Sequence, residues 1–299
     1  MSETSRTIVV GVDGAEFGLL AVRWAAQVAS QRGFQLEIVH TVRSPRPAYG
    51  DIMMGSTELA DAVRDDGRQV IEDAVAAARS IDGKLEVRTV MPTDSPTENL
   101  IRRSHSARMV VVGCRGANAF TAMLLGSTAA AVLSHAECPV AVIRGRAESA
   151  EFIPDGPVVV GIDGSPVSER ALEVAFEEAS VRAMPLVVVH AWSDVAYDEL
   201  GGLARLAVNW ESIEGAERRY LAERLAGWGE KYPDVEVRRV LVRDRPRHAL
   251  LEWSAKAQLV VVGSRGRGGF LGLLLGSTSQ ALAQHAKCPV LVVRPSKNP

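Results

Sequence analysis

Short apolar runs alternate with longer amphipathic segments along the whole chain. The runs are rich in Val and Ile without polar alternation, as is typical of parallel strands covered on both faces by helices. In the first half they predict strands at Thr7–Val12, Gln35–Val42, Leu85–Val90, Met109–Gly113 and Val140–Ile143, with helices near Phe17–Arg32, Thr57–Ile81, Pro96–Ser106 and Ser127–Ala136. The second half predicts strands at Val158–Ile162, Leu186–Ala191, Val235–Leu241, Leu259–Gly263 and Val290–Val293, with helices near Ser168–Ala183, Ala207–Lys231, Pro246–Ala257 and Ser277–His285.

The two halves repeat each other. Residues 110–144 align with residues 260–294 without a gap, and 20 of the 35 positions are identical. The same offset matches the first predicted strand of each half and the Asp-Gly pair that follows it. This internal duplication predicts two tandem domains, residues 1–146 and 157–299, joined by a polar linker at 147–156.

Each domain is expected to be a Rossmann-like α/β unit with five parallel strands in the order 3-2-1-4-5 and helices on both faces. Ligands of such sheets bind beyond the carboxyl ends of the strands, where the strand order reverses. Here that place lies between the first and fourth strands. Asp13 and Asp163 follow the first strands, whereas Gly113 and Gly263 end the fourth. These residues are therefore expected to face one crevice in each domain.

A glycine-rich loop follows each fourth strand. Glycine lacks a Cβ and lets the backbone approach a ligand closely, and the helix that begins after the loop offers unpaired N–H groups to a phosphate. The alternative is that the glycines only end a strand and that the Ser-Thr pair only caps a helix. Recurrence of the full spacing favours a phosphate site, made by Gly113, Gly116, Gly126, Ser127 and Thr128 in one half and by Gly263, Gly266, Gly276, Ser277 and Thr278 in the other.

Charged side chains add two further expectations to this site. Arg265, like Arg115, either contacts a phosphate or is a solvated loop residue. Asp13 and Asp163 either bond a ribose hydroxyl, or hold Mg²⁺ together with phosphate oxygens, or cap the turn after their strand.

Several catalytic signatures are absent from the sequence. It contains no GxxxxGK[ST] motif, no GxGxxG at the first turn, no GxSxG and no HExxH. Fast phosphoryl transfer needs cations on the phosphates and a residue that orients the nucleophile. The sequence therefore predicts a binding site without the parts of a fast enzyme.

Composition narrows the class of partner. A formal net charge of −2 argues against a protein whose main partner is nucleic acid, and no apolar run is long enough to span a membrane. Because the first residues are polar and no signal peptide is recognisable, the chain is expected to be soluble and cytoplasmic.

The combined pattern of glycine loop, strand-ending Asp and closing Cys-Pro-Val strand resembles universal stress proteins in tandem form. The resemblance implies ATP in each domain, pairing of the two domains, homodimers formed through the last strands, and a role in stress, dormancy or growth control through an unknown protein partner. It also implies that Asp13 and Asp163 sit beside the nucleotide, and that the backbone at Thr41 and Ala191 meets the adenine.

The main hypothesis is thus an ATP-binding regulator that is not an enzyme. A slow ATPase or an adenylyl-transfer enzyme is the alternative, and a scaffold that has lost its ligand is a third reading. The two sites also differ, since Ala15 and Ala117 of the first half correspond to Ser165 and Arg267 of the second. Unequal binding by the two copies is therefore expected.

Overall fold

The computed structural model describes residues 6–42, 56–114, 125–144, 155–192, 210–267 and 274–295. The chain divides into two compact units, Met1–Ala150 and Glu151–Pro299, each of which contributes five strands. Of the residues described, none belongs to a helix long and apolar enough to cross a bilayer.

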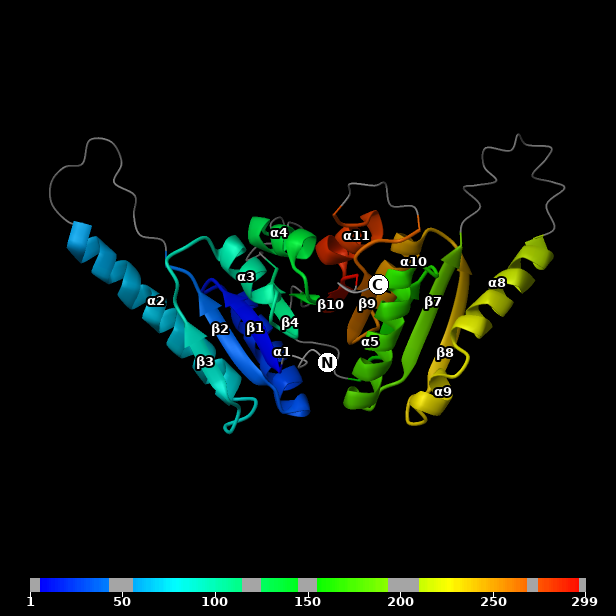
Figure 1. Cartoon of the computed structure of the whole chain (residues 1–299), viewed down its shortest axis with the longest axis horizontal. Helices are drawn as coiled ribbons and strands as arrows, with labels where there is room; N and C mark the ends of the chain where they lie inside the picture. Colours follow the sequence, from blue (N-terminus) through cyan, green and yellow to red (C-terminus); the bar gives the residue numbers. More distant parts are fainter. Residues whose placement is uncertain are drawn as a thin grey trace, which may run out of the picture. The chain divides into compact units, whose positions relative to one another are not determined.

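The first unit alternates strands and helices (Figure 1). Its hydrogen-bonded strand order is β3-β2-β1-β4-β5, and every pairing is parallel. The elements are β1 Thr7–Val12, α1 Glu16–Arg32, β2 Gln35–His40, α2 Ser56–Arg79, β3 Val87–Val90, α3 Pro96–Ser104, β4 Met109–Gly113, α4 Ser127–His135 and β5 Val140–Ile143.

The second unit repeats this arrangement in the order β8-β7-β6-β9-β10, again with parallel pairing. The elements are β6 Val158–Ile162, α5 Pro166–Arg182, β7 Leu186–Trp192, α8 Trp210–Arg224, α9 Trp228–Lys231, β8 Val237–Arg243, α10 Pro246–Ser254, β9 Leu259–Gly263, α11 Ser277–His285 and β10 Val290–Val293. Two Rossmann-like α/β units, as the sequence predicts, are confirmed.

Helices cover both faces of each sheet. In the first unit α1 packs with α2, whereas α3 packs with α4, and both α1 and α3 contact β1 and β4. Successive side chains of a strand point to opposite faces, and Ile8, Val9 and Val10 are all at most 2% exposed. Continuous apolar strands are thus explained by burial on both faces.

Some predicted boundaries are wrong by a few residues. The strand predicted over Leu85–Val90 begins at Val87, and the one predicted over Val235–Leu241 runs from Val237 to Arg243. The helix predicted to reach Lys231 is two helices, α8 and α9. Gly227 precedes α9 with φ of 80°, a left-handed conformation that interrupts an α-helix.

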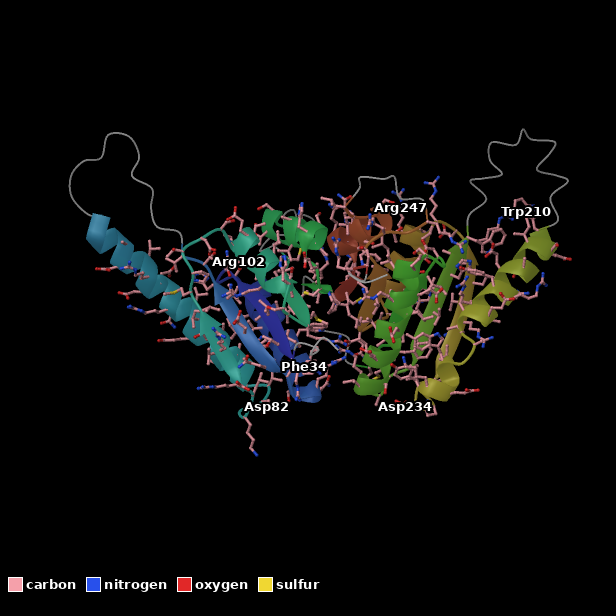
Figure 2. The ribbon with its side chains drawn as sticks, in the orientation of Figure 1. Phe34, Asp82, Arg102, Trp210, Asp234 and Arg247 are labelled. Atoms are coloured by element: carbon pink, nitrogen blue, oxygen red, sulfur yellow. The ribbon has the colours of Figure 1, made fainter. Side chains whose placement is uncertain are left out.

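The edge opposite the carboxyl ends is held by a repeated hydrogen bond. Ser30 Oγ donates to Asp82 Oδ2 over 2.7 Å in the first unit, and Ser180 Oγ donates to Asp234 Oδ2 over 2.7 Å in the second. Figure 2 shows Asp82 and Asp234 at this edge, and Arg102 and Trp210 toward the other end of their units. These hydrogen bonds thus lie at the edge opposite the loops that form the candidate site.

Candidate nucleotide-binding site

A crevice opens at the carboxyl edge of each sheet, where neighbouring strands lead to helices on opposite faces. Its volume is about 300 Å³ in the first unit and about 460 Å³ in the second. The first crevice is lined by Asp13, Thr41, Gly113, Gly126 and Thr128 among the predicted site residues. The second is lined by Asp163, Ala191, Gly263, Arg265, Gly266, Gly276, Ser277 and Thr278.

Two predicted residues of the first site stand apart from this list. Ser127 begins α4 but is not part of the crevice wall. Gly116 lies outside the described residues, as does Arg115. The glycine loop of the second unit is described as far as Arg267, whereas that of the first unit is described only as far as Cys114.

Asp163 anchors the glycine loop of the second unit. Its Oδ1 accepts hydrogen bonds from the Ser165 N–H over 3.0 Å and the Ser165 hydroxyl over 2.7 Å. Its Oδ2 accepts a hydrogen bond from the Arg267 N–H over 2.8 Å. The carboxylate thus connects the turn after β6 to the end of the loop after β9.

Hydrogen bonding also sets the charge of Asp163. Burial by itself raises the pKa of this carboxyl, but the hydrogen bonds from Ser165 and Arg267 outweigh it and hold the pKa below its usual range. Such a group stabilises the fold above its unfolded-state pKa, and this stabilisation is lost as the pH falls through the folded-state pKa. The loop therefore depends on an ionised Asp163.

Asp163→Asn is expected to lower the free energy of unfolding at pH 7, because an amide presents N–H donors where a carboxylate accepts. The difference from wild type should shrink as the pH falls below about 4, where the carboxyl of the unfolded chain gains its proton, and should be lost as the pH falls through the lower pKa of the folded state. Urea unfolding at several pH values measures this. Asp13→Asn is the matched control, since Asp13 is exposed and accepts a hydrogen bond from the Ala15 N–H over 3.1 Å. A difference equally large at pH 7 and pH 3 would contradict the role of the ionised form.

The loop after β9 closes on the start of α11. The Gly276 N–H donates to the Ser264 carbonyl over 2.7 Å, and the Ser279 hydroxyl donates to the Gly263 carbonyl over 2.6 Å. No side chain caps α11, whose N-cap residue is Gly276. The first N–H groups of α11 therefore stay available beside the crevice.

Glycine is required at the tightest point of this loop. A Cβ built on Gly266 would lie 2.4 Å from Asp163 Oδ2, which is shorter than any real carbon–oxygen contact. The backbone of Gly266 thus passes directly over the carboxylate that anchors the loop.

Helix α8 contributes residues that the sequence reading missed, one of which contacts Arg267 in the wall of the second crevice. Glu217 lies 2.7 Å from His190 Nε2, and Tyr220 accepts a hydrogen bond from Arg267 Nη2 over 2.6 Å. Glu217, Tyr220 and Arg224 share one helical face because they are spaced by three and four residues. In the first half the equivalent residues are Gly67, Val70 and Ala74. The difference in residue type between the two halves at these positions is the sequence signal that could have identified the α8 residues.

His190 and His40 orient the ends of their strands. His190 Nδ1 lies 3.0 Å from the Ile162 carbonyl and His40 Nδ1 lies 3.0 Å from the Val12 carbonyl. Because a carbonyl oxygen only accepts, each Nδ1 carries a proton. Both histidines are thus fixed through Nδ1 in the same way, and among the described residues a carboxylate partner is found only for His190.

An aromatic cluster lies beside the second crevice. The Arg243 guanidinium is 3.6 Å from the centre of the Trp210 ring, and the Trp192 and Trp210 rings are 6.3 Å apart. Trp192 follows Ala191, which lines the crevice, and Trp210 is labelled in Figure 2 at the start of α8. Sequence reading missed this cluster because its three members come from separate elements.

Comparison with known proteins decides the family. The sequence profile described as "Universal stress protein family" matches residues 4–144 and 156–294. The chain belongs to the universal stress protein family. It is 45% identical over 295 residues to universal stress protein Rv2005c of Mycobacterium tuberculosis, covering 97% of each chain. It is 40% identical over 296 residues to universal stress protein Rv2623 of the same species, covering 98% of each.

A solved universal stress protein structure has the same fold. The crystal structure of a universal stress protein from Archaeoglobus fulgidus matches with a TM-score of 0.70 at 20% sequence identity. The match covers 98% of this chain and 99% of that one. At this identity the likeness extends to the fold alone, so both tandem units are universal-stress-protein folds.

One buried polar atom lies next in sequence to the wall of the second crevice, between Gly263 and Arg265, without itself lining the crevice. The Ser264 side chain is 0% exposed, and its hydroxyl has no hydrogen-bond partner among the described residues. A buried hydroxyl without a partner costs free energy of folding. At the equivalent place in the first unit, Arg144 Nη1 lies 2.8 Å from Cys114 Sγ, and burial raises the pKa of this thiol.

Proposed function

We propose that each unit binds one nucleotide, with ATP as the ligand, and that the protein is a regulator rather than an enzyme. The observation that carries the proposal is the second crevice, where a glycine loop passes over Asp163 and meets the uncapped start of α11. A helix start and a glycine loop together suit the phosphates of an anionic ligand. Membership of the universal stress protein family supports the same reading.

The residues present fit a nucleotide with Mg²⁺. Gly263, Gly266, Gly276, Ser277 and Thr278 would hold phosphates in the second unit, and Ala191 would meet the base. The described residues contain no group of three or more His, Cys, Asp or Glu side chains that could hold a metal by themselves. A Mg²⁺ held by Asp13 or Asp163 would take its other ligands from phosphate and water, and would neutralise phosphate charge.

A non-enzymatic role is supported by the chemistry at the crevices. Among the described residues that line the crevices there is one histidine, His40, which is fixed through Nδ1 to a backbone carbonyl. Asp163 is engaged by hydrogen bonds from Ser165 and Arg267. Neither group is placed as a free base. We infer a cytoplasmic protein that forms homodimers and acts on growth or dormancy through a protein partner that senses its nucleotide state.

The test is the nucleotide content of the purified full-length chain. Mass spectrometry of a denatured extract and titration calorimetry with ATP and Mg²⁺ should give about two nucleotides per chain, since each unit has one crevice. Absence of nucleotide from the extract together with no heat of ATP binding would overturn the proposal. Turnover at or above roughly 1 s⁻¹, lost in Asp13→Ala/Asp163→Ala, would instead favour the enzyme.

A further inference from the structure

The second crevice carries a cation that has no equivalent in the first half of the sequence. Arg267 lines this crevice, and Ala117 occupies the matching position of the first half. The guanidinium donates to the Tyr220 hydroxyl, and it lies 5.1 Å from the centre of the Tyr220 ring. Within the described part of the chain, no carboxylate forms an ion pair with Arg267, so its charge is left for a ligand.

Tyr220 is held in place from three sides. Its ring lies 5.5 Å from the His190 ring on β7, and the Arg224 guanidinium lies 5.0 Å from its centre. Its hydroxyl reaches over the turn after β6, where a Cβ on Gly164 would lie 1.3 Å from it. Gly164 also has φ of 76°, a left-handed conformation that favours glycine. Glycine therefore suits this position both for its backbone conformation and for the space that the Tyr220 hydroxyl occupies.

Arg267 is consequently fixed at both ends. Its backbone N–H donates to Asp163 and its guanidinium to Tyr220, so the side chain is ordered before any ligand arrives. A cation ordered in advance loses less conformational entropy on binding an anion. Val70 stands where Tyr220 does in the first unit, and it offers neither a ring nor a hydroxyl.

We propose that Arg267 makes the second crevice selective for nucleotides with more phosphate charge, namely nucleoside triphosphates over monophosphates. The first crevice discriminates less, because the sequence of the first half has Ala117 and Val70 where the second has Arg267 and Tyr220. A charge-assisted contact from a guanidinium gains strength as charge is added to the phosphate chain. Arg267 is thus a specificity-determining residue and Tyr220 its positioning residue. This inference rests on the proposed nucleotide binding.

The experiment is titration calorimetry of the full chain with ATP and with AMP. Loss of one class of sites in Gly266→Ala assigns that class to the second crevice. In this class, Arg267→Ala should weaken ATP binding about tenfold and AMP binding less than about threefold. Arg219→Ala removes the same charge from an exposed position on α8 outside the crevice and should leave the ATP-to-AMP ratio unchanged.

Two further variants sharpen the result. Tyr220→Phe keeps the ring and removes the hydroxyl, so it should lower the ATP-to-AMP ratio part of the way while thermal unfolding stays unchanged. Ala117→Arg should raise the ratio in the first crevice. An unchanged ratio in Arg267→Ala overturns the inference and leaves nucleotide binding standing, whereas a wild-type chain that binds neither nucleotide overturns both.

Discussion

Gly266→Ala should abolish nucleotide binding in the second unit, with a loss of at least about tenfold in affinity, while the unit remains folded. The added Cβ would lie 2.4 Å from Asp163 Oδ2. Relief of this clash requires either the Asp163 carboxylate or the loop to shift, and either movement breaks the hydrogen bond from the Arg267 N–H to Asp163. The phosphate-facing N–H groups then lose their arrangement, and misplaced donors cost binding energy.

Titration calorimetry with ATP and thermal unfolding measure the two effects separately. Gly215→Ala is the matched control, because its Cβ would meet only Arg219 Nη1 at 3.7 Å and because alanine favours a helix interior by about 0.5–1 kcal/mol. Adding Gly116→Ala should remove the first site as well. Wild-type affinity in Gly266→Ala would show that the phosphate loop lies elsewhere.

Phe176→Ala should destabilise the second unit by about 3–5 kcal/mol, the usual cost of deleting a buried phenylalanine. Phe176 is 0% exposed. Its ring stacks on Trp228 at 4.8 Å and on Tyr232 at 5.4 Å between ring centres. The substitution therefore removes the aromatic contact between α5 and α9, and it leaves a cavity where the Phe176 ring now packs.

Urea unfolding measures this loss. Val181→Ala on the same helix is the control, since Val181 is 39% exposed and its truncation should change stability by less than about 0.5 kcal/mol. The first unit has Ala26 at the equivalent position, so its own unfolding should not change. A cost below about 1 kcal/mol for Phe176→Ala would mean that Trp228 and Tyr232 close the space.

Much of the fold follows from local pattern. Strands such as Val110–Val112 and Val260–Val262 are read from the sequence because burial on both faces admits only apolar side chains. The ends of helices and strands are harder to predict from the sequence. The limits of the strand Val87–Val90, for example, depend on its pairing with β2 rather than on its residue composition. The break before α9 likewise depends on the conformation of one glycine, Gly227.

Half of the candidate site could likewise be predicted from local sequence pattern. Asp163, Gly263 and Gly266 were predicted to face one crevice because parallel strands end at a common edge, and all three line it. Glu217 and Tyr220 were missed, because a residue in the middle of a polar helix gives no local sign that it reaches a strand 27 residues earlier or a loop 47 residues later in the chain.

The sequence by itself determined the duplication, the α/β class, the family and the glycine spacing, because repetition, strand burial and backbone close approach all leave local marks on residue type. Only the tertiary structure decided how Asp163 is used, as an anchor for the loop through Arg267, and how Tyr220 orders that arginine. Both decisions depend on distances between elements far apart in the chain. Such distances are set by packing of the whole unit.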